Sequence, residues 1–287
     1  MPSAMPRRDA IVMPRIGLGT WRMGEQPAQR GREVAALRTA LALGYRMIDS
    51  AEMYGEGGAE QVVGQALADA LRVGEVQRNQ LFIVSKVYPH NATRDGVAAA
   101  CERSLRRLGL DCIDLYLLHW RGAVPLAETV DAMRTLVQRG HIRAWGVSNF
   151  DRDDLLELEA VAGDEAAGCA ANQVYYSLTA RGVEFDLLAW QAERGMPLMA
   201  YSPIDQGAIA DERRLAAVAA RHGATPAQIA LARLLAEPGV VVIPKAVQPA
   251  HLRANFEAAT LTLTPQDIAE IDRLFPPPRH ATPLAMR

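Results

Sequence analysis

Short apolar runs alternate with longer helical patterns from about residue 16 to the end of the chain. The runs begin at intervals of roughly 30 residues, which is the size of one strand–helix unit. A strand of a parallel sheet is buried on both faces, so it appears in a sequence as a continuous apolar segment. On this basis we predict strands at residues 16–19, 45–49, 81–86, 112–119, 142–147, 170–173, 197–201 and 240–244.

Repeated strand–helix units of this number predict an α/β chain folded as a closed (β/α)8 (TIM) barrel. Barrels of about 250 residues routinely form one domain, so we expect a single domain over residues 1–287. The domain would begin with an extension at residues 1–15 and end with an added helix at 264–274 and a tail at 276–287. The prolines at 276–278 separate that helix from the tail, because they cannot continue a helix.

Helical periodicity predicts further helices at residues 33–43 and 94–108, and a pair at 212–221 and 225–236 between the last two strands. Asp151 is expected to cap the helix after the fifth strand. Thr225 and Pro226 are expected to open the second helix of the pair, as cap and first-turn residue.

Composition narrows the classes of function. The formal net charge of −2 is spread over both signs, which leaves no basic surface for nucleic acid and makes a small-molecule substrate the default. The three widely spaced cysteines are expected to be reduced thiols in a cytoplasmic protein, and the six histidines show no paired spacing for a metal site. We expect neither a signal peptide nor a membrane span, and a monomer is the default.

Three polar residues end predicted strands, namely Asp49, Lys86 and His119. A fourth, Tyr54, follows the second strand in a glycine-rich loop. The carboxyl ends of barrel strands carry the chemistry in this architecture, so these four groups are expected to meet at one mouth. Reduction of a carbonyl needs a proton for the oxygen and a group that polarises the C=O bond, and this set can supply both.

These four residues, together with seven flanking segments, resemble the aldo-keto reductase family, whose proton-donor residues are Asp, Tyr, Lys and His in this order. The resemblance covers nearly the whole chain. It is strongest toward compact bacterial enzymes that reduce small aldehydes and 2-oxoaldehydes such as methylglyoxal. The flanking segments are residues 17–21, 44–51, 115–120, 145–150, 172–173, 200–203 and 243–245.

The resemblance implies a role for each of the four residues. Tyr54 is expected to act as the general acid for the carbonyl oxygen. Lys86 is expected to lower the pKa of Tyr54 by favouring the phenolate, while Asp49 keeps Lys86 charged. His119 is expected to orient the carbonyl group.

The resemblance also implies NADPH as cofactor, with NADH as an alternative, bound in an extended form across the mouth. A Rossmann domain is not expected, because Arg22 stands where the third glycine of that fingerprint belongs. The residues that match the family's cofactor contacts are Thr20, Trp21, Ser148, Asn149, Gln173, Tyr201, Ser202, Lys245, Ala246, His251 and Asn255.

One segment departs from the family pattern. Ala246, His251 and Ala254 stand where the family usually has Ser, Arg and Glu. Two expected contacts to a 2′-phosphate are therefore missing or weakened. We expect NADPH to be preferred over NADH, but with less discrimination than in strict members of the family.

Large side chains just past the strand ends are expected to wall the substrate pocket, namely Trp21, Tyr88 and Trp120. Short loops and a short tail predict a shallow, open pocket for small or varied aldehydes and ketones. Two rival functions stay open at this point. Lys86 is also what a Schiff-base lyase on the same barrel needs, and a nicotinamide-sensing regulatory protein can share a reductase scaffold.

Overall fold

The computed structural model describes residues 11–163 and 168–287, so the expectations for the first ten residues lie outside the described part. Within that part, eight parallel strands are hydrogen-bonded in chain order. A parallel bridge between Ile16 and Val242 joins the last strand to the first and closes the barrel. The strands are β1 (Gly17–Gly19), β2 (Met47–Asp49), β3 (Phe82–Val87), β4 (Ile113–Leu118), β5 (Ile142–Ser148), β6 (Cys169–Tyr175), β7 (Leu198–Tyr201) and β8 (Val240–Val242).

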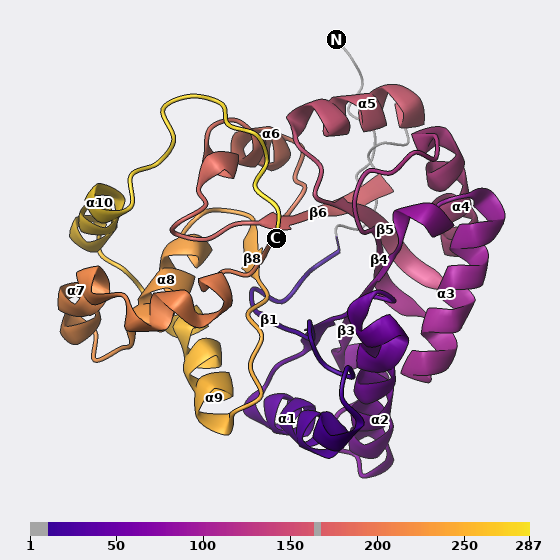
Figure 1. The fold of residues 1–287 in the computed structure, drawn as a ribbon, viewed down its shortest axis with the longest axis horizontal. Coiled ribbons are helices and arrows are strands. Elements are labelled where there is room, and N and C mark those ends of the chain that lie inside the picture. The colour runs from indigo at the N-terminus through magenta and orange to yellow at the C-terminus, as the bar shows by residue number, and fades with distance from the viewer. Residues whose placement is uncertain (1–10, 164–167) are drawn as a thin grey trace.

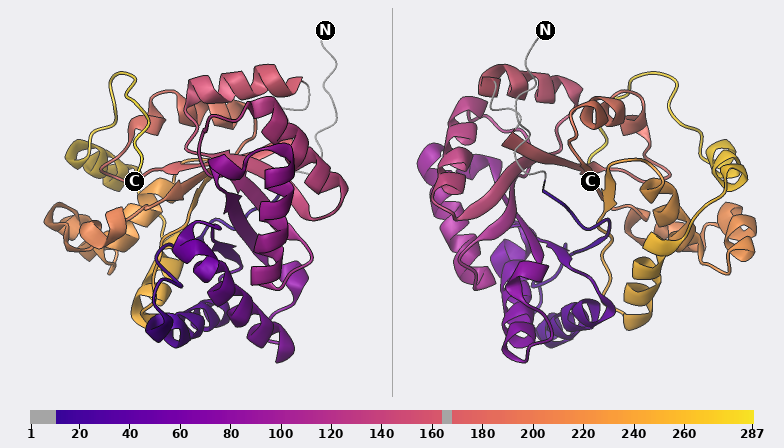
Figure 2. Two further views of the ribbon diagram at one scale, coloured as in Figure 1. Left: turned by 45° about the vertical axis from the view of Figure 1, so that its right-hand side comes forward. Right: turned by 180° about the vertical axis from the view of Figure 1, so that it is seen from behind.

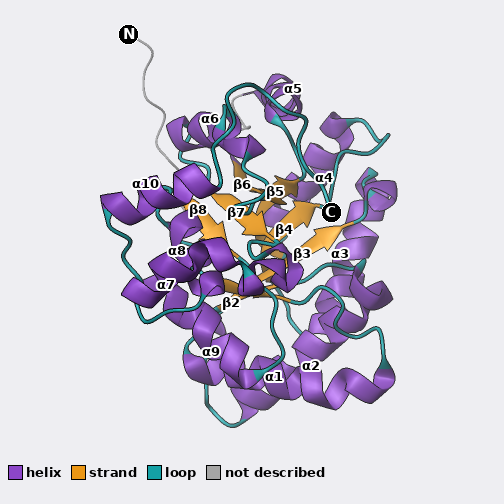
Figure 3. Cartoon of the chain, turned by 60° about the vertical axis from the view of Figure 1, so that its left-hand side comes forward, coloured by secondary structure: helices purple, strands orange, loops and turns teal. Residues whose placement is uncertain are grey.

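Helices surround the strands in every ribbon view (Figure 1, Figure 2, Figure 3). The predicted (β/α)8 barrel with an added C-terminal helix is therefore confirmed. No helix of the described residues has the length and apolar character needed to cross a membrane. The helices are α1 (Arg30–Leu43), α2 (Gly58–Arg72), α3 (Arg94–Leu108), α4 (Leu126–Gln138), α5 (Arg152–Ala162), α6 (Leu187–Glu193), α7 (Ala216–Arg221), α8 (Pro226–Leu235), α9 (Pro249–Glu257) and α10 (Pro265–Leu274).

Differences from the predicted elements concern their ends. β2 begins two residues late, because the N–H of Tyr45 still bonds the helical carbonyl of Ala40 at 3.0 Å. The helix predicted at 212–221 begins as a 3-10 turn, since the Glu212 carboxylate accepts a hydrogen bond from the N–H of Arg214; α7 follows from Ala216.

Side-chain caps fix where several helices begin. Asp151 and Asp154 form a reciprocal capping box at the start of α5, which confirms the predicted cap. Thr225 caps α8 in the same way, with Pro226 at the first helical position. Thr264 caps α10.

The apolar residues form one layer inside the barrel and another between the strands and the helices. Along β4, Leu115 and Leu117 belong to the inner layer, whereas Tyr116 and Leu118 belong to the outer one. Burying a large apolar side chain stabilises a fold by about 1.5–3 kcal/mol, so a one-residue slip of a strand would be strongly disfavoured. The two layers therefore fix which residues of each strand face the mouth.

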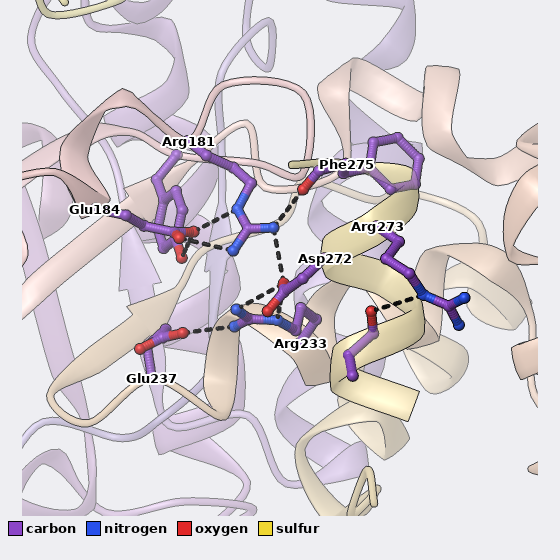
Figure 4. Close-up of polar contacts among 9 residues, drawn as sticks. Arg181, Glu184, Arg233, Glu237, Asp272, Arg273 and Phe275 are labelled. Carbon is purple, nitrogen blue, oxygen red and sulfur yellow. Dashed lines mark hydrogen bonds and ion pairs between the residues drawn. The ribbon is translucent and has the colours of Figure 1, made fainter. Parts of the chain in front are cut away.

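Partly buried ion pairs hold α10 against α8 (Figure 4). Arg181 donates to Glu184 at 2.7 Å and to Asp272 of α10 at 2.8 Å, and Arg233 of α8 donates to the same Asp272 at 3.0 Å. Arg181 also donates to the carbonyl of Phe275, where α10 ends. This network positions the start of residues 276–287, which return from α10 toward the middle of the molecule in Figure 1.

Candidate active site

The two-residue alternation of the strands turns the predicted site residues toward the mouth. Leu115 and Leu117 of β4 face the barrel interior, and His119 continues the same face two residues later. Other predicted site residues at strand ends also lie two positions after a residue of the inner layer. They are Asp49, Lys86, Gln173, Tyr201 and Lys245.

Lys86 lies at the centre of the predicted catalytic group and is fully buried. Its Nζ donates to Asp49 Oδ2 at 2.7 Å, to the carbonyl of Ser50 at 2.8 Å and to the hydroxyl oxygen of Tyr54 at 3.2 Å. An ammonium has three N–H donors, so all of them are used. Because Tyr54 accepts from Lys86, its own hydroxyl proton is left to point at another acceptor.

Burial and charge set the protonation of this pair. Burial lowers the pKa of Lys86, but the interactions with Asp49 and Tyr54 together outweigh this and the net pKa is raised. The pKa of Tyr54 is also raised, because burial outweighs the lowering effect of Lys86. Lys86 therefore acts on the pKa of Tyr54 in the expected direction, but the sequence did not show that burial would outweigh it. Tyr54 consequently keeps its proton at neutral pH.

His119 lies beside Tyr54, with the ring centroids 5.7 Å apart in an edge-on arrangement. Burial, followed by the positive charge of Lys86, lowers the pKa of His119 well below 6.5. Its Nδ1 is buried and has no hydrogen-bond partner among the described residues. The ring is therefore neutral at pH 7 and can donate one N–H to a carbonyl oxygen.

Ser148, Asn149 and Tyr201 form a connected polar group at the same mouth. The Tyr201 hydroxyl donates to Asn149 Oδ1 at 2.9 Å, and Asn149 Nδ2 donates to the His119 carbonyl at 3.1 Å and to Ser148 Oγ at 3.2 Å. Asn149 and Ser202 adopt positive φ angles of 57° and 48° directly after β5 and β7. Backbone of this kind is costly and tends to cluster at functional sites.

Gln173 connects β6 to the catalytic group, because its Nε2 donates to Asp49 Oδ1 at 2.7 Å. Its Oε1 is left as an acceptor, and the Ser148 hydroxyl is left as a donor. The carboxamide of a nicotinamide ring offers one NH2 donor and one C=O acceptor. The free donor and acceptor of this group therefore fit that amide.

Lys245 follows β8 and lines a pocket of about 290 Å³. The other predicted contacts of this region do not line it: Ala246 is buried in the outer layer, Asn255 is buried on α9, and His251 is exposed on α9. The pocket residues are Arg22, Glu25, Gln26, Gln29, Arg32, Glu33, Lys245 and Val247.

Thr20, another predicted cofactor contact, is fully buried, and its hydroxyl donates to the Asp49 carbonyl at 2.9 Å. This bond ties the end of β1 to the end of β2 and thereby supports the backbone that carries Asp49.

Aromatic side chains adjoin His119 where the substrate pocket was predicted. The Trp120 ring lies 4.9 Å from the His119 ring and 6.0 Å from the Tyr88 ring. Glu52, which the sequence did not single out, holds Tyr88 by accepting from its backbone N–H at 2.8 Å. Trp21, on the loop after β1, lies under the Arg22 guanidinium at 4.4 Å.

The tail closes part of the mouth that the sequence predicted to be open. The backbone N–H of Arg287 donates to the Tyr201 hydroxyl at 3.2 Å, and its guanidinium lies 5.0 Å from the Tyr175 ring centre. Leu284 packs against the outer layer. No local pattern in the sequence predicts this contact, because the partner of Arg287 lies 86 residues away.

A barrel with an ammonium, a phenol and an amide-binding group at its mouth is typical of an oxidoreductase that uses a nicotinamide cofactor. Comparison with known proteins supports that class. The family model described as the aldo/keto reductase family matches residues 15–275. The chain is 44% identical over 286 residues to the methylglyoxal reductase YeaE of Escherichia coli K12, with 96% of each chain covered.

Solved structures agree with this match. An aldo/keto reductase from Klebsiella pneumoniae, in complex with NADP and acetate, is 46% identical, with a TM-score of 0.90 over 96% of this chain and 95% of that chain. A thermostable aldo-keto reductase in complex with epalrestat is 39% identical, with a TM-score of 0.85 over 96% of this chain and 100% of that chain. This chain belongs to the aldo/keto reductase family. The prediction of an NAD(P)H-dependent oxidoreductase that reduces carbonyl groups is thereby confirmed.

Proposed function

We propose that this chain reduces small aldehydes and 2-oxoaldehydes, such as methylglyoxal, to alcohols, with NADPH as reductant and Tyr54 as proton donor. The observation that carries the proposal is the Lys86 ammonium, which is paired with Asp49 and donates to the oxygen of Tyr54. The Tyr54 proton is thereby left for a substrate. The 44% identity to a protein named methylglyoxal reductase supports the substrate class.

Each step on the protein side follows from this geometry. When bound, NADPH supplies the hydride for the carbonyl carbon. Tyr54 donates its O–H to the carbonyl oxygen and releases the proton as negative charge develops there. Lys86 stabilises the resulting phenolate, Asp49 keeps Lys86 in place, and the neutral His119 donates a second hydrogen bond that orients the carbonyl.

The cofactor would lie along the mouth from Gln173 to Lys245. Gln173 Oε1 and the Ser148 hydroxyl would hold the carboxamide, and the Tyr201 ring would stack on the nicotinamide. Lys245 would meet a phosphate at the other end. This placement is supported by the free donor and acceptor at Ser148 and Gln173 and by the exposed ammonium of Lys245.

The Schiff-base alternative is disfavoured by the state of Lys86. A Schiff base needs a neutral amine with a free lone pair, but the pKa of Lys86 is raised and all its protons are bonded. Borohydride treatment in the presence of a carbonyl substrate is expected to leave no covalent adduct on Lys86, as measured by mass spectrometry.

The test of the proposed function is loss of NADPH absorbance with the purified protein and methylglyoxal. An aromatic aldehyde serves as a second substrate, and NADH replaces NADPH in a parallel series. We expect oxidation with both substrates and a higher kcat/KM for methylglyoxal and for NADPH. Tight NADPH binding without turnover of any carbonyl would favour the regulatory alternative, and absence of NADPH binding would contradict the proposal.

A further inference from the structure

The pocket beside Lys245 gathers three cations that form no ion pair with a described residue. Arg22, Arg32 and Lys245 all line it. Among the described residues, none of these three side chains forms an ion pair or donates a hydrogen bond. By contrast, Arg181 and Arg233 are both engaged by carboxylates (Figure 4).

The two carboxylates of the pocket neutralise these cations only in part. Glu33 is 7% exposed and its Oε2 accepts from the N–H of Gly24 at 2.9 Å. Gly24 has a φ of 74°, and a Cβ there would lie 2.1 Å from the backbone of Gly58, so this loop is fixed by close packing. Glu25 is exposed and forms no ion pair with a described residue. Three cations against two carboxylates leave one net positive charge.

The positions of the cations add a modest cost that a bound anion would relieve. Arg32 lies in the first turn of α1, where the helix dipole disfavours a positive charge. Partial desolvation in the pocket lowers the pKa of Lys245, and repulsion from Arg22 and Arg32 acts in the same direction, although attraction to Glu33 and Glu25 opposes it. Both effects would reverse if the pocket held a group with two negative charges.

We propose that Arg22, Arg32 and Lys245 bind the 2′-phosphate of NADPH. They would take over the role of the Ser and Arg that the family usually has where this chain has Ala246 and His251. The inference rests on the proposed function, since it takes NADPH as the cofactor. A phosphate monoester carries up to two negative charges, and a guanidinium can donate two parallel hydrogen bonds to it. The phosphate would therefore be held from the loop after β1 and from α1.

NADPH has two groups that could bind to these cations, the 2′-phosphate and the pyrophosphate bridge. NADH has the bridge but lacks the 2′-phosphate, so a comparison of the two cofactors separates them. The equilibrium dissociation constants of both are measured by quenching of tryptophan fluorescence, for the wild type, Arg32→Ala and Arg32→Lys. Arg72→Ala is the matched control, because Arg72 is an exposed arginine at the end of α2 that pairs only with Asp69.

We expect Arg32→Ala to weaken NADPH binding about tenfold, as for loss of one charge-assisted hydrogen bond, and to leave NADH binding unchanged. Arg32→Lys should restore part of the NADPH affinity, and Arg72→Ala should change neither. Equal weakening of NADPH and NADH would overturn the 2′-phosphate assignment in favour of the pyrophosphate. Unchanged NADPH binding would overturn the role of Arg32 altogether. Failure of the wild type to bind either cofactor would instead overturn the proposed function.

Discussion

The lysine of the catalytic group, Lys86, and the lysine of the pocket after β8, Lys245, have opposite surroundings. Lys86 is fully buried, all its N–H donors are bonded within the protein, and its pKa is raised. Lys245 is exposed, has no bonded partner among the described residues, and its pKa is lowered. A catalytic ammonium must be positioned before the substrate arrives, whereas a phosphate-binding ammonium must keep its donors for the ligand.

The same contrast extends to their neighbours. Asp49 and Gln173 complete a buried, hydrogen-bonded group around Lys86. Next to Lys245, Arg22 and Arg32 form no ion pair or hydrogen bond with a described residue. We therefore expect substitutions at the first region to change stability and kcat together, and substitutions at the second to change cofactor affinity alone.

The largest expected effect is that of Lys86→Met. This change leaves the Asp49 carboxylate buried without its cation, which typically costs about 3–5 kcal/mol. Loss of the proton-transfer partner should lower kcat at least a hundredfold. Urea unfolding and steady-state kinetics measure the two effects. If Lys86→Met were fully active and as stable as the wild type, the proposed role of Lys86 in both stability and catalysis would be contradicted.

The pH dependence of kcat tests the protonation states. Tyr54 must be protonated to act as an acid, and its pKa is raised above 10, so kcat should fall only as the pH rises beyond 10. The pKa of His119 lies well below 6.5, so its protonation should cause no loss between pH 6.5 and 10. Stopped-flow jumps at saturating NADPH measure this range. A decrease in kcat centred near neutral pH would contradict these assignments.

Lys245→Met should change the affinity for NADPH and leave the catalytic group around Lys86 unaffected. Loss of one charge-assisted contact to a phosphate should raise the dissociation constant of NADPH about tenfold. The exposed side chain contributes no bonded partner, so the free energy of unfolding should change by less than about 0.5 kcal/mol. Fluorescence titration and urea unfolding measure the two quantities. A large loss of stability would show that Lys245, like Lys86, has a structural role in the fold.

The smallest effect is expected at a site away from both lysines. Thr264→Ala removes the side-chain cap of α10 and should cost about 1 kcal/mol of stability. NADPH affinity should stay at the wild-type value, because α10 does not line the pocket. Altered NADPH binding would show that the ion-paired scaffold around α10 is coupled to the cofactor region.

The sequence predicted the barrel and the catalytic group because both follow from local pattern. Continuous apolar runs located the strands, and polar residues at their ends, such as Asp49 and Lys86, necessarily meet at one mouth. The net pKa of Tyr54 could not be derived this way, because it depends on the balance between burial and the nearby ammonium. The approach of Arg32 to Lys245 depends on how the start of α1 lies relative to the segment after β8, and no local pattern predicts this.

The contact between Arg287 and Tyr201 also could not be predicted from the sequence. It results from the direction in which the tail leaves α10, and the ion pairs of Asp272 with Arg181 and Arg233 fix that direction. These pairs join residues far apart in the chain, and no spacing rule predicts them.

The most direct test of the account is the rate of a single turnover of Tyr54→Phe with NADPH and methylglyoxal. Tyr116→Phe is the matched control, because Tyr116 is also a buried tyrosine but lies in the outer layer, away from the mouth. We predict that Tyr54→Phe binds NADPH with wild-type affinity but oxidises it at least a hundredfold more slowly, while Tyr116→Phe reacts at the wild-type rate. NADPH oxidation at the wild-type rate in Tyr54→Phe would contradict the assignment of Tyr54 as the proton donor.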